Sequence, residues 1–424
     1  MSEVLPRLRF NLDFMPSPDP AKPGLYIRDP YHYSDTTLLV PPQLVQVLEC
    51  FDGEQSTLDL RSELVRITGE IEVGDLEKHL FDALDEAGFL DNDRYRQLKT
   101  NREAEFAGEV VREPNFAGSA YPAHQIQLAE LLTSRIGGPQ GSASTVGIAA
   151  PHASPDGGWD TYRAAYRCLP PLEDASERTF VILGTSHYGA PERFGLTRKR
   201  FATPFGTAQT NVRLVDELAQ ASDGAVRMED YCHSVEHSIE FQVVFLQHLY
   251  GPQVRILPIL CGPFVKSIYE GGLPEENEGV ARFLDALANL GAREGKRLFW
   301  VLGVDMAHMG RRYNDPLRAT ANIGEMVAIE QRDRERIGKI AVGDLGGYWS
   351  MVQDGHDDLK WCGSSPFYTF MKAMPGLRGE LLNYQQWQID PQSVVSFGAI
   401  AFGPRPTNSL AEYGSAVPAG PPKP

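Results

Sequence analysis

The stretch FVILGTSHYG, residues 180–189, decides the fold, because four apolar residues lead straight into Gly-Thr-Ser and then into His187. A second stretch has the same form: VGIAAPHA, residues 146–153, is a short apolar run that ends at His152. Short apolar runs bounded by glycine or proline are typical of buried strands. We therefore expect two buried strands, each with a histidine just past its carboxyl end.

A third apolar run, LFWVLGVDMAHMG at residues 298–310, ends at Asp305 and His308. In open α/β sheets the ligand crevice lies outside the carboxyl ends of the strands. The three stretches together therefore predict one edge of a sheet at which imidazole and carboxylate side chains gather.

The rest of the chain supports an α/β fold. Apolar runs of strand length alternate with stretches of helical spacing, such as VRLVDELAQA, VRILPILCG, VARFLDALANLG and VVSFGAIAFG. Alternation of this kind predicts a mostly parallel central sheet with helices on both faces.

Four segments are expected. Residues 1–95 predict a small α+β, winged-helix-like module with short acidic helices, and residues 96–111 predict a charged helical linker. Residues 112–404 carry the α/β pattern and form the predicted metal-binding domain, and the Pro/Gly/Ala-rich residues 405–424 predict a disordered tail.

Composition excludes several classes of protein. The formal net charge of −16 argues against a general nucleic-acid binder, which needs basic surfaces. No apolar run approaches the length of a membrane span, and the first residues lack the apolar core of a secretory signal. The five cysteines are widely spaced without a Cys-x-x-Cys pair, which indicates free thiols and a cytoplasmic location.

Two imidazoles need further ligands to hold a metal ion such as iron, zinc, copper or nickel. The open candidates are the Asp305–His308 pair, the cysteines at 261 and 362, and HSVEHSIEFQ at residues 233–242. The order His-x-x-Glu-His in the last of these resembles the inverted zincin motif. The stretch reads as the start of a helix, however, whereas that motif lies in the middle of one.

Five motifs in order carry a resemblance to a known family: PHA, GTSH, EHSIEFQ, DMAH and CGSSP. Together with the opening VREPNFAGSAYP they resemble the Memo family, over about residues 110–403. That family is similar in fold to the class III extradiol dioxygenases. The resemblance implies a metal pocket built from His152, His187 and Cys362, with Fe²⁺ the expected ion and Zn²⁺ or copper as alternatives.

The resemblance also implies acid or base groups beside the metal, namely His237, His308 and Asp305. Relatives usually read Pro-His-Ala-Gly-Tyr where this chain has PHASPDGGW, so an aromatic pocket residue is either missing or supplied by Trp159. Ser186 and Glu236 complete the predicted substrate pocket.

Three functions follow as hypotheses. The first is a non-heme iron redox enzyme, or a component of a radical-SAM-associated modification system with a radical-SAM protein and an AMMECR1-like protein as partners. The second is a non-catalytic module that binds a peptide or phosphopeptide, and the third is a zinc hydrolase. The N-terminal module resembles PqqD-type peptide-recognition domains in its general pattern, which implies a peptide substrate there.

Overall fold

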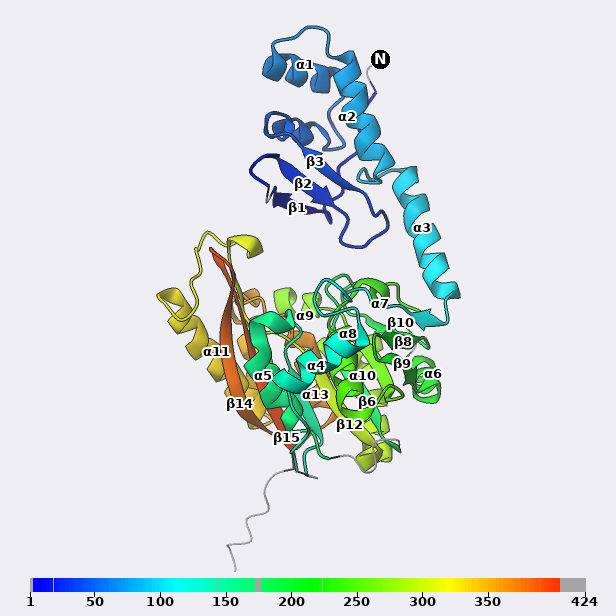
Figure 1. Cartoon of the computed structure of the whole chain (residues 1–424), viewed down its shortest axis with the longest axis vertical. Coiled ribbons are helices and arrows are strands. Elements are labelled where there is room, and N and C mark those ends of the chain that lie inside the picture. Colours follow the sequence, from blue (N-terminus) through cyan, green and yellow to red (C-terminus); the bar gives the residue numbers. More distant parts are fainter. Residues whose placement is uncertain (1–2, 18, 143, 172–176, 223, 405–424) are drawn as a thin grey trace, which may run out of the picture.

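The computed structural model describes residues 3–17, 19–142, 144–171, 177–222 and 224–404 (Figure 1). The predicted disordered tail at residues 405–424 lies outside the described residues. Among the described helices, none combines the length and the hydrophobicity that a membrane span requires. All five cysteines are free thiols, as expected.

The N-terminal module, described residues 3–92, is a small antiparallel sheet covered by helices. Its elements are β1 (Asp13–Pro16), β2 (Leu25–Arg28), β3 (Thr37–Val40), η1 (Pro42–Leu44), η2 (Gln46–Cys50), α1 (Thr57–Thr68) and α2 (Gly74–Glu86), with sheet order β1-β2-β3. Helix α1 buries Leu60 and Leu64, which lie four residues apart on one face, and it ends at Gly69 in the left-handed conformation. The module is thus α+β, as expected, and its likeness to winged-helix domains stays a prediction.

A single charged helix, α3 (Asp93–Gly108), leads from the module to the rest of the chain (Figure 1). The Asn92 side chain caps it by accepting a hydrogen bond from Tyr95 N. The predicted linker at residues 96–111 thus coincides with most of this helix and the start of β4 (Val111–Arg112). The domain limits themselves stay predictions.

The large part of the chain is built on a twelve-stranded mixed sheet. Its central strands β5 (Gly147–Ala150), β12 (Leu298–Gly303), β6 (Thr179–Thr185) and β11 (Arg255–Cys261) are adjacent in this order and parallel. Every residue of the first three is buried, which explains their uninterrupted apolar sequences.

Further strands, some of them short and some of them antiparallel to their neighbours, extend the sheet on both sides. They are β7 (Phe194–Leu196), β8 (Arg200–Thr203), β9 (Gly206–Thr210), β10 (Val226–Met228), β13 (His308–Gly310), β14 (Arg378–Asp390) and β15 (Ser393–Gly403). Strand β15 pairs antiparallel with β5, β13 and β14.

Helices cover both faces of this sheet, which confirms the predicted architecture (Figure 1). One core packs under α4 (Gln125–Arg135), α5 (Pro155–Arg167) and α8 (Glu240–Tyr250). The other packs under α6 (Val212–Ala221), α10 (Glu278–Glu294), α11 (Glu325–Ala341), α12 (Leu345–Gln353) and α13 (Ser364–Ala373). The short helices α7 (Cys232–Val235) and α9 (Val265–Glu270) lie in connections.

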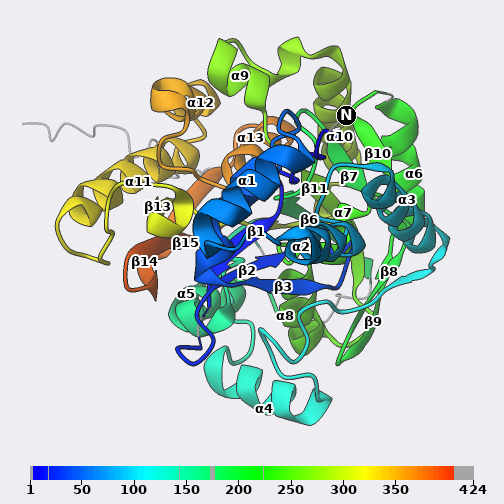
Figure 2. The same cartoon turned by 90° about the horizontal axis from the view of Figure 1, so that it is seen from above.

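The N-terminal module stands beyond one end of the large sheet and over its middle (Figures 1 and 2). Side chains from both parts meet there in a small apolar cluster that contains Tyr33, Phe106, Tyr231 and Val235. The module therefore packs against the edge at which strand-end residues gather.

Candidate metal centre

Three neighbouring strands deliver the predicted strand-end residues to one place. His152 follows β5, His187 follows β6 and Asp305 follows β12, which lies between the other two. Because β12 pairs in parallel with both neighbours, all three strands end at the same edge of the sheet. The expected gathering at one edge is confirmed.

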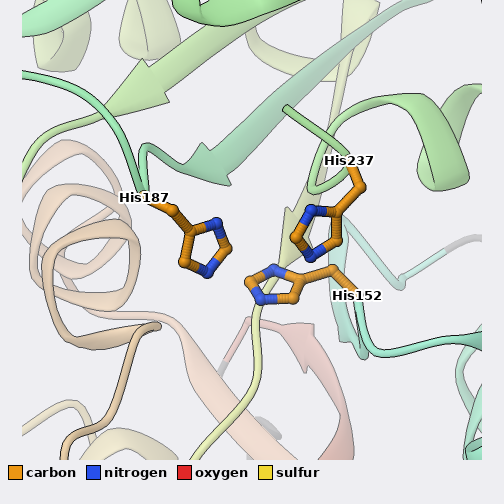
Figure 3. Close-up of side chains that lie close together, drawn as sticks. All are labelled: His152, His187 and His237. Carbon is orange, nitrogen blue, oxygen red and sulfur yellow. The ribbon is translucent and has the colours of Figure 1, made fainter. Parts of the chain in front are cut away.

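A fourth residue, His237, joins them from the short connection between α7 and α8. One ligand atom from each of His152, His187 and His237 lies within 4.8 Å of the others, which is a possible metal site (Figure 3). The ring centroids are 5.0 Å apart in each of the three pairs. The cluster is thus compact enough for one ion.

Hydrogen bonds on the far side of two rings orient them. His152 Nδ1 lies 2.8 Å from the Gly303 carbonyl oxygen, which only accepts, so Nδ1–H donates and Nε2 keeps its lone pair. His187 Nδ1 lies 2.8 Å from Glu236 Oε1, so Nε2 is the ring nitrogen that can bind a metal ion once it loses its proton. Partners of this kind fix the ring and raise the basicity of a metal ligand.

Glu236 is the most connected carboxylate of the site. It is buried, and besides the His187 ring it accepts hydrogen bonds from His187 N at 2.8 Å and His237 N at 3.0 Å. Burial alone raises its pKa, but the facing His187 and His237 hold the pKa well below the usual value. Glu236 therefore lies behind the imidazoles as an ionised anchor, and the predicted contact with a substrate stays a prediction.

The pKa values of the imidazoles differ strongly. Burial lowers the pKa of His152 to about 3 and that of His237 to about 3, so both rings are neutral at pH 7. Burial also lowers the pKa of His187, but Glu236 and Cys362 raise it well above the ordinary value. In the metal-free protein the cluster thus pairs two neutral rings with one charged ring that faces a carboxylate.

Cys362 lies beside the cluster, just before α13. Its Sγ is 3.2 Å from His152 Nε2 and 3.5 Å from the Asp305 carbonyl oxygen. Burial raises the pKa of the thiol, although His187 opposes the shift. The predicted ligand set His152, His187 and Cys362 is therefore brought together, and the structure adds His237 to it as a potential ligand.

Asp305 and His308 flank the same site. Asp305 Oδ1 accepts a hydrogen bond from His152 N at 3.0 Å, and burial raises the pKa of its carboxyl group. His308 Nδ1 faces the carbonyl oxygens of Met306 at 2.9 Å and Lys360 at 3.1 Å, and burial lowers its pKa. Both positions suit proton transfer, which stays a prediction.

The remaining predicted pocket residues lie differently. Ser186 is buried beside His187, and among the described atoms its hydroxyl has no hydrogen-bond partner. The Trp159 ring packs near Phe245, 6.4 Å between centroids, and under the Arg135 guanidinium. Two aromatic residues not singled out from the sequence lie closer to the cluster: the Phe116 ring is 5.4 Å from His237 and the Tyr188 ring 6.3 Å from His187. Tyr188 directly follows His187, which is the one signal that pointed to it.

The inverted zincin alternative is wrong. Helix α7 ends at Val235 and Glu236 is extended, so His233 and His237 do not share a helix face. His233 Nε2 lies 3.0 Å from the Gly195 carbonyl oxygen, and its ring packs against Phe201. His233 is thus a core histidine that is hydrogen-bonded through Nε2, and its buried Nδ1 has no partner among the described atoms.

Comparisons with known proteins show which family the chain belongs to. The model of a family described as Memo-like protein matches residues 112–401. A MEMO1 family protein of Aquifex aeolicus is 26% identical over 94% of this chain and 99% of its own length. Those of Thermococcus kodakarensis (29% identical, 69% of this chain, 99% of the relative) and Thermoplasma acidophilum (33%, 60% and 82%) match a smaller share of this chain. The matched family segment contains the whole histidine cluster, and the chain belongs to the Memo-like protein family.

Proposed function

We propose that this chain is a metal-dependent oxidoreductase of the non-heme iron type. One ion is held by His152, His187 and His237, with Cys362 as a sulfur donor. The observation that carries the proposal is the convergence of three imidazoles within 4.8 Å, beside a thiol 3.2 Å from one of them. Neutral imidazoles suit iron, copper and zinc, and a thiolate adds a soft donor.

The chain's own groups prepare this site. The Gly303 carbonyl and the Glu236 carboxylate hold two rings with Nε2 toward the cluster. The raised carboxyl pKa of Asp305 favours its protonated form and the lowered imidazole pKa of His308 favours its neutral form, so the first is suited to donate a proton and the second to accept one. When bound, ferrous iron supplies a redox-active Lewis acid with open coordination positions.

A zinc hydrolase is the second candidate, and the three-histidine cluster is the observation that favours it. Three protein ligands plus a water are the usual arrangement of catalytic zinc, with three histidines as one known set. Copper is a further candidate ion for the same donors.

The wider setting is also part of the proposal and rests on the family resemblance. It comprises a cytoplasmic location, a radical-SAM protein and an AMMECR1-like protein as partners, and a peptide bound at the N-terminal module. Co-purification of the full-length chain with each partner tests these associations.

Metal analysis tests the function. The protein is purified without oxygen, and bound metals are quantified beside the variants His187→Ala, His237→Ala and Cys362→Ala. His248→Ala is the matched control, because this histidine packs against Phe205 outside the cluster. Stoichiometric iron that is lost in the site variants and kept in the control supports the redox enzyme, and oxygen-uptake assays follow. Zinc with the same pattern favours hydrolysis, and the absence of any metal contradicts both.

A further inference from the structure

The seam between the N-terminal module and the metal-binding part is tightly packed. The Tyr231 hydroxyl donates to the Tyr31 carbonyl oxygen at 2.9 Å, and the Tyr33 and Tyr231 rings stack with centroids 5.1 Å apart. Tyr31 also contacts Tyr188, with 5.0 Å between ring centroids. Since Tyr188 follows His187 in the chain, the module touches the residue next to the metal cluster.

Polar contacts from α3 and the residues that follow it strengthen the seam. Arg227 pairs with Glu103 at 3.0 Å, and Lys199 Nζ donates to the Glu109 carbonyl oxygen at 2.6 Å. The same helix pairs with the module's loop through Arg102 and Asp35 at 2.6 Å. These contacts hold residues 29–37 of the module over the carboxyl edge of the sheet (Figure 2).

A groove remains open within this seam, and it is bordered by aromatic residues that contact the histidine cluster. A cavity of 270 Å³ has Asp29, His32 and Asp35 of the module on one wall, and Phe116 and Tyr188 on the other. The last two rings are the aromatic neighbours of His237 and His187. The groove therefore passes directly outside the cluster.

The exposure of the three rings shows which side of the cluster is open. The side chains of His187 and His237 are 27% and 26% exposed, whereas that of His152 is 2% exposed. The two exposed rings are those next to the walls of the groove. A molecule in the groove can thus approach these two rings.

The groove continues into a second cavity that is rich in carboxylates. This cavity measures 310 Å³ and shares His32, Asp35, Asn115 and Val235 with the first. It adds the carboxylates of Glu105, Glu109 and Glu113 to the lining.

The positive charges there are already used. Arg112 is buried against Glu240, and Arg102 pairs with Asp35 and Glu105. Arg28, which lines the first cavity, pairs with Asp13. No described Lys, Arg or His side chain lies within 4.0 Å of the exposed Glu109 and Glu113 carboxylates. The unpaired negative charge of the groove therefore lies in the second cavity, at Glu109 and Glu113, because Asp29 pairs with Arg9 and Asp35 with Arg102.

We propose that substrates reach the metal centre through this groove, and that it selects a polar, extended segment that carries positive charge, such as a lysine- or arginine-containing peptide. Residues 29–37 of the module form its outer wall, and Glu109 and Glu113 set its charge. The inference rests on the proposed function, because it takes the histidine cluster as the destination.

Cys362 allows a test that is independent of metal and of activity. Its thiol lies beside His152, so its rate of modification reports how easily a reagent arrives. The full-length chain is kept metal-free with a chelator and treated with a cationic or an anionic methanethiosulfonate of equal size. Mass spectrometry gives the rates at which the cationic and the anionic reagent modify Cys362. The ratio of these two rates is divided by the same ratio measured with glutathione, which corrects for the intrinsic reactivity of the reagents. Cys168, half-buried after α5, serves as the internal reference.

The proposal expects the cationic reagent to react faster at Cys362 than its ratio with glutathione predicts. The double variant Glu109→Lys, Glu113→Lys should lower the ratio of cationic to anionic reaction rates at Cys362 by about threefold at low salt. At low ionic strength the charges of these two residues still act on a reagent that passes through the groove. The double variant Asp285→Lys, Glu325→Lys is the matched control. Both residues are exposed on α10 and α11, and neither residue lines the groove. An unchanged ratio, or an equal change in the control, overturns the charge selection.

A second variant tests the route itself. Tyr31→Ala removes the contacts with Tyr33 and Tyr188, so both rates at Cys362 should rise while those at Cys168 stay constant. Tyr269→Ala, an exposed tyrosine on α9, is the control. Rates at Cys362 that do not respond to Tyr31→Ala show that the module is not the outer wall. A chain that binds no metal but passes these tests fails only the proposed function.

Discussion

The two carboxylates of the EHSIE motif are only four residues apart, yet we expect their replacement to have different consequences: loss of metal affinity for Glu236 and loss of folding stability for Glu240. Glu236 anchors His187 and His237, whereas Glu240 is buried against Arg112 and accepts hydrogen bonds from Asn115 N and Phe116 N, both at 3.0 Å. The variants Glu236→Gln and Glu240→Gln keep the size of the side chain and remove its charge.

For Glu236→Gln the loss falls on metal binding. Four N–H donors face its two oxygens: His187 N, His187 Nδ1, His237 N and, at 3.5 Å, Ser238 N. A glutamine offers one oxygen, so its own NH₂ opposes at least one of these donors. Loss of such a partner to a ligating histidine costs about 10- to 100-fold in metal affinity, which is about 1.4–2.8 kcal/mol.

For Glu240→Gln the loss falls on folding. Arg112 is 1% exposed, so its charge is left buried without an anionic partner, although three backbone carbonyl oxygens still accept hydrogen bonds from it. Breaking a buried pair in this way costs about 3–5 kcal/mol of stability. Glu236→Gln is expected to cost less, because His187 can release its proton and Arg112 cannot.

Competition with a chromophoric chelator measures metal affinity, and urea unfolding of the metal-free protein measures stability. We expect Glu240→Gln to keep its metal affinity within about threefold, because none of the hydrogen-bond partners of Glu240 is itself hydrogen-bonded to a ligand ring. If Glu236→Gln binds metal as the unaltered protein does, or if both variants weaken binding equally, the anchoring role of Glu236 is refuted.

Three further predictions concern protons and packing. Metal binding at pH 7 should release about two protons, one from the Cys362 thiol, whose pKa is raised by burial, and one from His187, whose pKa the facing carboxylate and thiol raise well above its ordinary value despite burial. Calorimetry in buffers of different ionisation enthalpy should find about one proton fewer for Cys362→Ser. The absence of any proton release would contradict the prediction. Burial lowers the pKa of His233 to about 4, so as the pH falls the unfolded state takes up the proton before the folded state does. About 2 kcal/mol of stability is therefore lost between pH 7 and pH 5. Urea unfolding of His233→Gln should show a pH dependence smaller by that amount, and an unchanged dependence would exclude this histidine as its cause. In Gly303→Ala the new methyl group would lie 2.1 Å from a backbone oxygen, which should cost about 1–3 kcal/mol of stability and weaken metal binding. A methyl group added at Gly346 meets no atom within 4 Å, so Gly346→Ala should change neither stability nor metal binding. Equal melting temperatures of the two variants would be evidence against strain at Gly303.

Local sequence was sufficient to identify the strands that position the site. The three apolar runs are fully buried strands because both faces of a parallel sheet are covered by helices, which favours apolar side chains on both sides of each strand. Parallel neighbours end at the same edge, so the meeting of His152, His187 and Asp305 could be inferred before any contact was known. The free cysteines and the α/β class also follow from composition and alternation.

Other features depended on contacts between distant residues. His237 lies in an irregular connection with no period of its own, so only the packing of α7 and α8 against the sheet shows that its ring enters the cluster. The same holds for Glu236, whose place behind His187 depends on a contact across 49 residues. The His-x-x-Glu-His order was misleading because its residues span a helix end.

The sequence by itself thus determined the class of fold, the edge of the sheet that carries the chemistry, and most of the side chains gathered there, because strand periodicity and chain direction are local properties. Only the tertiary structure decided which imidazoles share one centre, which carboxylate orients them, and that the N-terminal module stands over the open side. The physical reason is that ring orientation and the burial of a charge arise from residues far apart in the chain, such as Arg112 with Glu240 or Tyr31 with Tyr188.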